Sequence, residues 1–332
     1  MDYLILTPDG VGSTYLQRAL TVYLNSSGLS YYNTHELLNG IELDQNNNLY
    51  KRMQGYNQSI KTIVSLLENN CANLVSRLAE YHIHARSQGQ TPKTPKGVKN
   101  RSHSADILER NTQESYAPLY EICKQKFDRI LYCTRDSFEY SLSWGIRNYT
   151  GKYNVYSISE RLDVHSNDAD YEIDTTFMTE KLDQYDRYIY WVRDNFPSAQ
   201  PVTYNDIHTD IDSVLAQITG MDYSMQDTWG ISLQDYNTML YRVSKIYNPA
   251  IQYSDNLQDY QQQLVDEKKM FLRGMPIKMT TLAEKQDRVS NFTECVQNYN
   301  TWADTKNEYD TIDLNKIADM IAQEKRIYEI YN

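Results

Sequence analysis

Two glycines stand between a short apolar run and a helix-like run near the start of the chain. Tyr3–Thr7 reads YLILT, and apolar residues recur at helical spacing from Ser13 onward. Glycine lets a backbone turn sharply and approach a ligand, and the free N–H groups at a helix start attract an anion. A helix cap by Ser13 explains the same pattern. The residues of this first turn that would contact a phosphate or sulfate are Gly10, Gly12, Ser13, Thr14 and Tyr15.

A second candidate anion site follows another apolar run, Arg129–Thr134, which reads RILYCT. Arg135 comes directly after this run, and Ser143 comes about two helical turns later. An arginine fork with a hydroxyl at the end of a strand suits a phosphate monoester. The structural alternative is that Arg135 pairs with Asp136 or another nearby acid.

Strands and helices are expected to alternate around these two turns. Besides the two apolar runs, the expected strands cover residues 29–34 and 201–204. The expected helices cover residues 13–24, 59–81, 116–127, 137–147, 177–195 and 211–219, and a further set follows Gly220 at 234–244, 257–272, 281–302 and 314–331. This alternation predicts a mostly parallel sheet with right-handed crossovers, followed by a helical part.

Composition narrows the class of protein. Hydrophobic residues make up 40% of the 332 residues and charged residues 23%, which predicts a packed core. The net charge of -11 disfavours general binding to nucleic acid, so any anionic ligand needs a local basic site. The four cysteines form no CxxC pair, which argues against a structural zinc site and fits a reducing compartment. With neither a signal peptide nor an apolar run of about 20 residues, we expect a soluble, cytoplasmic protein without a membrane span.

The two turns together resemble those of the sulfotransferases that use 3′-phosphoadenosine-5′-phosphosulfate (PAPS). Gly12-Ser-Thr-Tyr-Leu16 is similar to the G-[ST]-T-[WL]-L loop that follows the first strand in that family. Arg135, Asp136 and Ser143 match its R-[DN]-P-x-x-x-x-x-S pattern, with Ser137 where proline often stands. The resemblance implies that the first turn holds the 5′-phosphosulfate, with Tyr15 near the adenine, and that Arg135 and Ser143 hold the 3′-phosphate.

Two further segments resemble the family less closely. The stretch at 202–207 is similar to its YEDL element, which would place Tyr204 near the nucleotide. Phe271-Leu-Arg-Gly274 is a loose counterpart of a later R-K-G loop that contacts the 3′-phosphate, and so adds Arg273. The resemblance implies a P-loop-like three-layer α/β/α fold with a mostly parallel sheet and a helical C-terminal extension. We expect a nucleotide-binding domain at 1–220 and the extension at 221–332, packed on or beside it.

Gly10 departs from the family pattern, because the cytosolic branch has a catalytic lysine at this position. That lysine stabilises the charge that develops on the bridging oxygen. Either another cation does this work, with Arg18 and the basic run at 86–101 as candidates, or the chain has lost catalysis.

Sulfuryl transfer also needs a base that takes the acceptor's proton. Glu36 and His35 follow an expected strand, so they should emerge at the same sheet edge as the first turn. The resemblance favours Glu36, because some bacterial sulfotransferases have a glutamate base at about this position. His103 is the next candidate, and a capped helix start is the structural alternative.

The expected function is in-line transfer of a sulfuryl group from PAPS to a hydroxyl or amine acceptor, with PAP as the product and no metal. The acceptor would be a small molecule or a carbohydrate. Two alternatives stay open. In the first alternative, the chain is a non-catalytic binding or structural protein that retains the fold. In the second, it is a small-molecule kinase of related fold. The missing GK[ST] string disfavours the kinase.

Overall fold

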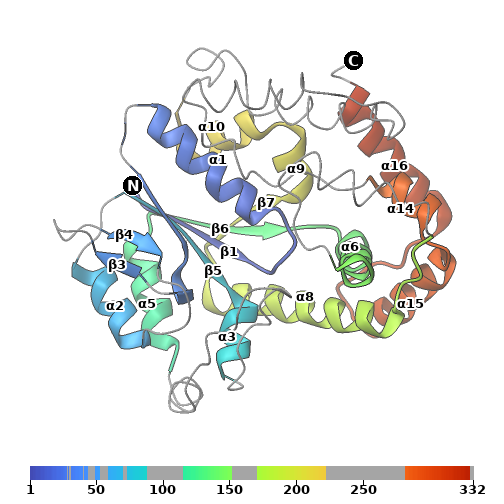
Figure 1. The fold of residues 1–332 in the computed structure, drawn as a ribbon, viewed down its shortest axis with the longest axis horizontal. Coiled ribbons are helices and arrows are strands. Elements are labelled where there is room, and N and C mark those ends of the chain that lie inside the picture. Colours follow the sequence, from blue (N-terminus) through green and yellow to red (C-terminus); the bar gives the residue numbers. More distant parts are fainter. Residues whose placement is uncertain are drawn as a thin grey trace. The chain divides into compact units, whose positions relative to one another are not determined.

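The predicted α/β class with a parallel sheet is confirmed. The computed structural model describes residues 1–27, 29, 31–39, 41–43, 49–52, 59–69, 73–87, 115–151, 170–221 and 281–329. Four strands, β5 (Leu74–Ala79), β1 (Tyr3–Thr7), β6 (Arg129–Thr134) and β7 (Gln200–Thr203), run parallel in that order. At the β5 edge, β2 (Tyr32–Glu36) pairs in parallel as well (Figure 1).

The carboxyl ends of β1 and β6 are neighbours, since Leu6 is paired with Tyr132. After β1 the chain continues to β2 on the β5 side of the sheet, whereas after β6 it continues to β7 on the opposite side. In parallel α/β sheets, ligands bind outside the carboxyl ends of the strands at the point where the connections diverge in this way. The two predicted turns follow these two strands.

Helices cover both faces of the sheet. On one face, Leu4 and Leu6 of β1 and Leu74 and Leu78 of β5 pack into a buried cluster. Most helical residues of this cluster come from α2 (Ile60–Asn69), α5 (Ala117–Lys126) and the C-terminal half of α8 (Thr175–Asn195). Because successive strand residues point to opposite faces, Tyr3 and Ile5 face the other side, where α1 (Ser13–Ser26) lies (Figure 1).

The prediction of one helix over residues 59–81 is wrong. The helix α2 ends at Asn69, β5 begins at Leu74, and α3 (Glu80–Ser87) follows. Asn73, just before β5, has φ 64, a left-handed conformation that an α-helix cannot continue through. Five of the six residues of β5 are buried, so the strand shows no alternation of polar and apolar residues that would distinguish it from a buried helix.

A small antiparallel pair was not predicted. It consists of β3 (Ile41–Leu43) and β4 (Leu49–Arg52), and a short helical turn, η1 (Leu37–Asn39), joins β2 to it. The other expected helices and strands within the described ranges are present, with ends that differ by a few residues, except that the helix expected over 281–302 is two helices.

The chain forms two compact units that interleave along the sequence. The first comprises residues 1–13, 20–134 and 184–203, and the second comprises 14–19, 135–183 and 204–332. In the second unit, α6 (Ser137–Thr150) packs with α15 (Phe292–Asp304) through Phe138, Leu142 and Tyr299. This unit also contains α9 (Tyr204–Thr209), α10 (Ile211–Thr219), α14 (Leu282–Arg288) and α16 (Leu314–Glu329), together with parts of α1 and α8. The expected domain limits, 1–220 and 221–332, stay a prediction.

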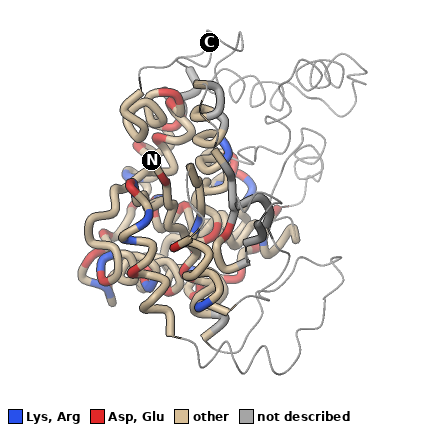
Figure 2. The backbone as a smooth tube through the Cα atoms, turned by 90° about the vertical axis from the view of Figure 1, so that its left-hand side faces the viewer, with Lys and Arg blue, Asp and Glu red and all other residues tan. Residues whose placement is uncertain are grey.

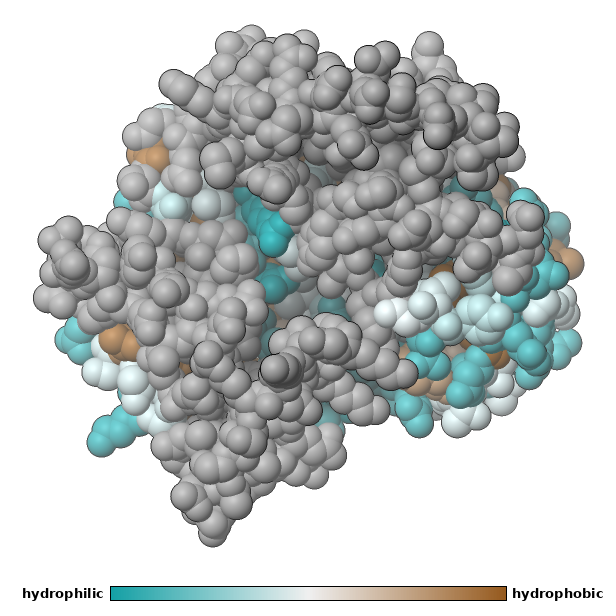
Figure 3. Space-filling view, viewed as in Figure 1, coloured by the Kyte–Doolittle hydropathy of each residue, from teal (hydrophilic) through white to brown (hydrophobic). Residues whose placement is uncertain are grey.

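Charged residues of both signs occur throughout the described part of the chain (Figure 2). Acidic and basic residues are interspersed along the described backbone (Figure 2). On the face drawn in Figure 3 the described surface is mostly hydrophilic, with small separate hydrophobic spots. None of the helices in the described part of the chain has the length and apolar character needed to cross a membrane.

Candidate functional site

The first turn has the strand, glycine turn and helix that the sequence predicts. The strand β1 ends at Thr7, and α1 begins at Ser13. Gly10 has φ 85 and Gly12 has φ 78, left-handed conformations that favour glycine at both positions. Because α1 starts directly after this turn, the backbone N–H groups of its first residues lie at the N-terminal end of the helix, next to the turn. This is a suitable local geometry for an anion.

Arg77 supplies a positive charge beside the first turn. It lies on β5, opposite Ile5 of β1, and its Nη1 donates to the hydroxyl of Ser13 at 3.5 Å. The sequence analysis considered Arg18 and the basic run as sources of this charge and missed Arg77, because residues 74–79 were expected to be helical. Their true register in the sheet brings this arginine to the turn.

The second turn also has the predicted local structure. Arg135 follows β6, and Asp136 caps α6 by accepting from the backbone N–H of Glu139 at 2.9 Å. Arg135 is buried, and its Nη2 lies 2.7 Å from Oε1 of Glu139. Burial alone would lower the pKa of Arg135, but the carboxylate of Glu139 and the ring of Tyr204 outweigh burial and raise it above its ordinary value.

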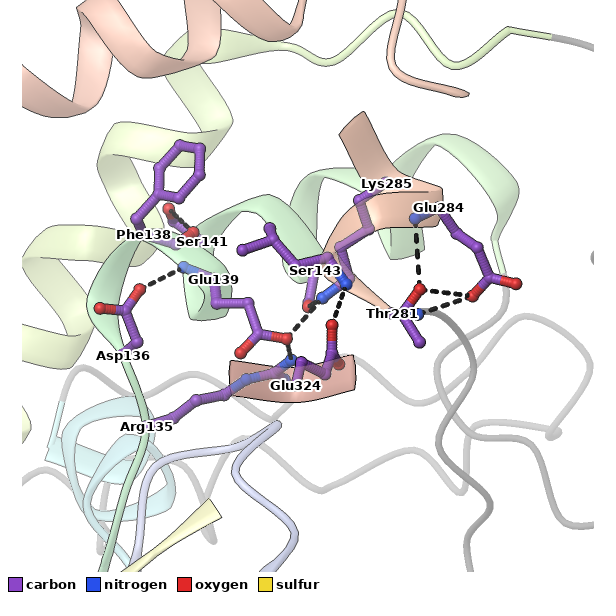
Figure 4. Close-up of polar contacts among 11 residues, drawn as sticks. Arg135, Asp136, Phe138, Glu139, Ser141, Ser143, Thr281, Glu284, Lys285 and Glu324 are labelled. Atoms are coloured by element: carbon purple, nitrogen blue, oxygen red, sulfur yellow. Dashed lines mark hydrogen bonds and ion pairs between the residues drawn. The ribbon is translucent and has the colours of Figure 1, made fainter. Parts of the chain in front are cut away.

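Lys285 joins Arg135 and Ser143, the two residues that were expected to bind a 3′-phosphate, in one polar network (Figure 4). Its Nζ donates to Oε1 of Glu139 at 2.9 Å and to the hydroxyl of Ser143 at 2.9 Å. The side chain of Lys285 is only 2% exposed. Glu324 of α16 reaches the same region and accepts from the backbone N–H of Leu282 at 2.7 Å.

A column of side chains connects the start of α1 to Arg135 within the second unit. Tyr15 stacks on His208 with ring centroids 5.5 Å apart and planes 10° apart. The ring of Tyr204 lies 4.3 Å from that of His208, and the guanidinium of Arg135 lies 3.9 Å above the ring of Tyr204. Three residues predicted from separate segments, Tyr15, Arg135 and Tyr204, therefore belong to one cluster. His208 was not predicted, although it follows Tyr204 by one helical turn.

Glu36, the predicted base, is a buried residue at the end of β2. It is 2% exposed, and its Oε1 accepts from the backbone N–H of Ala79 at 3.1 Å. Nδ1 of His82 lies 3.8 Å from the same oxygen. Because β2 pairs with β5, Glu36 stands opposite Arg77 in the sheet. The structure thus brings His82 next to the predicted base.

Some predictions cannot be followed to their side chains. Arg273, His103 and residues 88–101 of the basic run lie outside the described residues. The backbone of His35 belongs to β2, but its side chain lies outside what the structure describes.

The described residues offer no candidate metal site and no candidate reactive thiol. No group of three or more His, Cys, Asp or Glu residues in the described part of the chain is arranged to hold a metal ion. Cys123, Cys133 and Cys295 are free and buried. Burial raises the pKa of Cys133 and of Cys295 to about 12, so neither thiol is deprotonated at neutral pH.

Comparisons with known proteins do not assign this chain to a family. No model of a known protein family matches this sequence, and no curated protein matches it with significant similarity. The chain is thus an α/β protein with a parallel sheet, and its fold and local geometry carry the functional argument.

Proposed function

We propose that this chain binds PAPS at the carboxyl edge of its sheet and transfers the sulfuryl group to a hydroxyl or amine acceptor. The observation that carries the proposal is the convergence of Tyr15, Arg135 and Tyr204, with His208 between the two tyrosines. These residues come from the start of α1, the start of α9 and the turn after β6. The resemblance of separate short motifs to those of sulfotransferases assigned each of the three to the nucleotide.

The sheet topology supports the same ligand position. Both anion-binding turns follow strands whose carboxyl ends are adjacent and whose onward connections diverge. In the proposed arrangement the 5′-phosphosulfate accepts hydrogen bonds from the N–H groups at the start of α1. The 3′-phosphate pairs with Arg135.

The reaction requires little covalent chemistry from the protein. The acceptor attacks sulfur, the bond from sulfur to the 5′-phosphate oxygen breaks, and the electron pair of that bond remains on the departing PAP. Glu36 receives the acceptor's proton, and Arg77 stabilises the charge that grows on the leaving oxygen. Arg77 would thereby replace the lysine for which this chain has Gly10.

The alternative is a non-catalytic protein that keeps the fold, and one observation favours it. Arg135 already has a buried carboxylate partner in Glu139, which is what a purely structural arginine would show. A small-molecule kinase is a weaker alternative, because the first turn lacks the GK[ST] string.

Two assays on the full chain separate these functions. In calorimetric titrations, PAP should bind at least about tenfold more tightly than ATP, because only PAP has a 3′-phosphate to pair with Arg135. Incubation with sulfur-labelled PAPS and a panel of sugars, phenols and amines should then label an acceptor. Tight PAP binding without any transfer would support the non-catalytic protein, whereas a preference for ATP would support the kinase.

A further inference from the structure

Lys285 is a buried cation whose position the sequence pattern did not indicate. It belongs to the first turns of α14, which begins with a capping box formed by Thr281 and Glu284. The capping box fixes the start of the helix, and the Lys285 side chain extends from it toward α6 (Figure 4). A buried ammonium group is costly unless it is paired and hydrogen-bonded. Glu139 and Ser143 provide those contacts.

A single oxygen defines where the two cations meet. Oε1 of Glu139 lies 2.7 Å from Nη2 of Arg135 and 2.9 Å from Nζ of Lys285. Any oxygen at this point is therefore within hydrogen-bond distance of both cations. The hydroxyl of Ser143 accepts from the same Nζ at 2.9 Å. Two cations around one oxygen, with a hydroxyl bound to one of them, make a suitable site for a phosphate monoester.

The charges around this point also favour a phosphate. Arg135 and Lys285 carry two positive charges, Glu139 supplies a negative charge at hydrogen-bond distance, and the carboxylate of Glu324 also acts on Arg135. A phosphate dianion in place of the Glu139 carboxylate would offer both cations more charge and more acceptor oxygens. Arginine and lysine are complementary here, because arginine binds as a planar fork and lysine as a point charge.

We infer that Lys285 is a third ligand of the 3′-phosphate, together with Arg135 and Ser143, and that the carboxylate of Glu139 occupies the phosphate position when no nucleotide is bound. This inference rests on the proposed function. It adds a binding residue from α14, outside the motifs that resemble sulfotransferases. It also explains why Arg135 is paired in the ligand-free chain, since Glu139 acts as a replaceable partner.

The test compares two nucleotides and two lysines. PAP and adenosine 5′-phosphate differ in the 3′-phosphate, and calorimetry measures the affinity of each. Lys285→Met should weaken PAP binding at least about tenfold and change adenosine 5′-phosphate binding less than about twofold. Lys306→Met is the matched control, because Lys306 pairs with Asp183 in the same unit at 3.5 Å and lies outside the network. It should change neither affinity.

The remaining outcomes each decide a different point. If Lys285→Met loses the same affinity for both nucleotides, or loses none, the inference is overturned. Tight PAP binding by the wild-type chain would still support the proposed function in that case. A wild-type chain that binds no PAP would overturn the proposed function and the inference with it. If Lys285→Met does not fold, the PAP affinity of Glu139→Gln tests the inference instead. The inference requires tighter PAP binding in that variant, and weaker or unchanged binding overturns it.

Discussion

Replacing Glu139 by glutamine should lower the stability of the ligand-free chain by about 3 kcal/mol, because two buried cations lose their shared charge partner. The amide oxygen of glutamine can still accept a hydrogen bond, so the loss should lie at the lower end of the range for a broken buried pair. A fall of about 5 to 10 °C in the midpoint of thermal unfolding is expected. Added PAP should recover much of this loss, because its 3′-phosphate restores a negative charge between Arg135 and Lys285.

Glu121→Gln is the matched control for this experiment. Glu121 pairs with Lys124 on an exposed face of α5, where loss of the pair should cost less than about 1 kcal/mol. The double variant Glu139→Gln with Lys285→Met should be more stable than Glu139→Gln alone, since one uncompensated cation is removed. A midpoint in Glu139→Gln equal to that of the wild type would contradict the buried network.

Replacing Glu36 by glutamine should reduce turnover roughly a hundredfold or more while leaving PAP affinity nearly unchanged. Glutamine keeps the shape of the side chain and can still accept from the backbone N–H of Ala79, so the fold at the end of β2 should persist. It cannot accept a proton from the acceptor. Steady-state rates of sulfate transfer from labelled PAPS, together with PAP titrations, measure the two effects separately.

His35→Asn is the control for the base, because His35 is the neighbouring candidate from the sequence. This variant should lose much less activity than Glu36→Gln. The assignment is wrong if Glu36→Gln turns over normally and His35→Asn or a His103 variant is inactive. If all three variants behave alike and no acceptor is ever labelled, the non-catalytic protein becomes the better account.

The sequence predicted the elements around the two turns well. The strands β1 and β6 have the predicted limits, because each is a short apolar run bounded by turn or charged residues. The helix α10 ends at Gly220, which has φ 69, as a left-handed C-cap glycine requires. In such places the signal is local, since a few neighbouring residues determine the backbone conformation.

Long-range contacts explain what sequence reasoning missed. Arg77 becomes part of the site only when β5 takes its register beside β1, and Lys285 only when α14 lies next to α6. Glu139 offered a local signal, because it lies four residues after Arg135 and four before Ser143, and Glu139 and Ser143 share one face of α6. This spacing indicates that Glu139 can pair with Arg135, whereas the expectation from sequence named only Asp136 and unspecified acids.

The most direct test of the central claim is a titration of Arg135→Ala with PAP and with adenosine 5′-phosphate. Lys285 still neutralises Glu139 in this variant, so we expect it to fold. Loss of the charged fork should weaken PAP binding by about 2 kcal/mol, roughly thirtyfold, and leave adenosine 5′-phosphate binding almost unchanged. Equal losses for both nucleotides would show that Arg135 is a structural residue and would contradict a 3′-phosphate site at this turn.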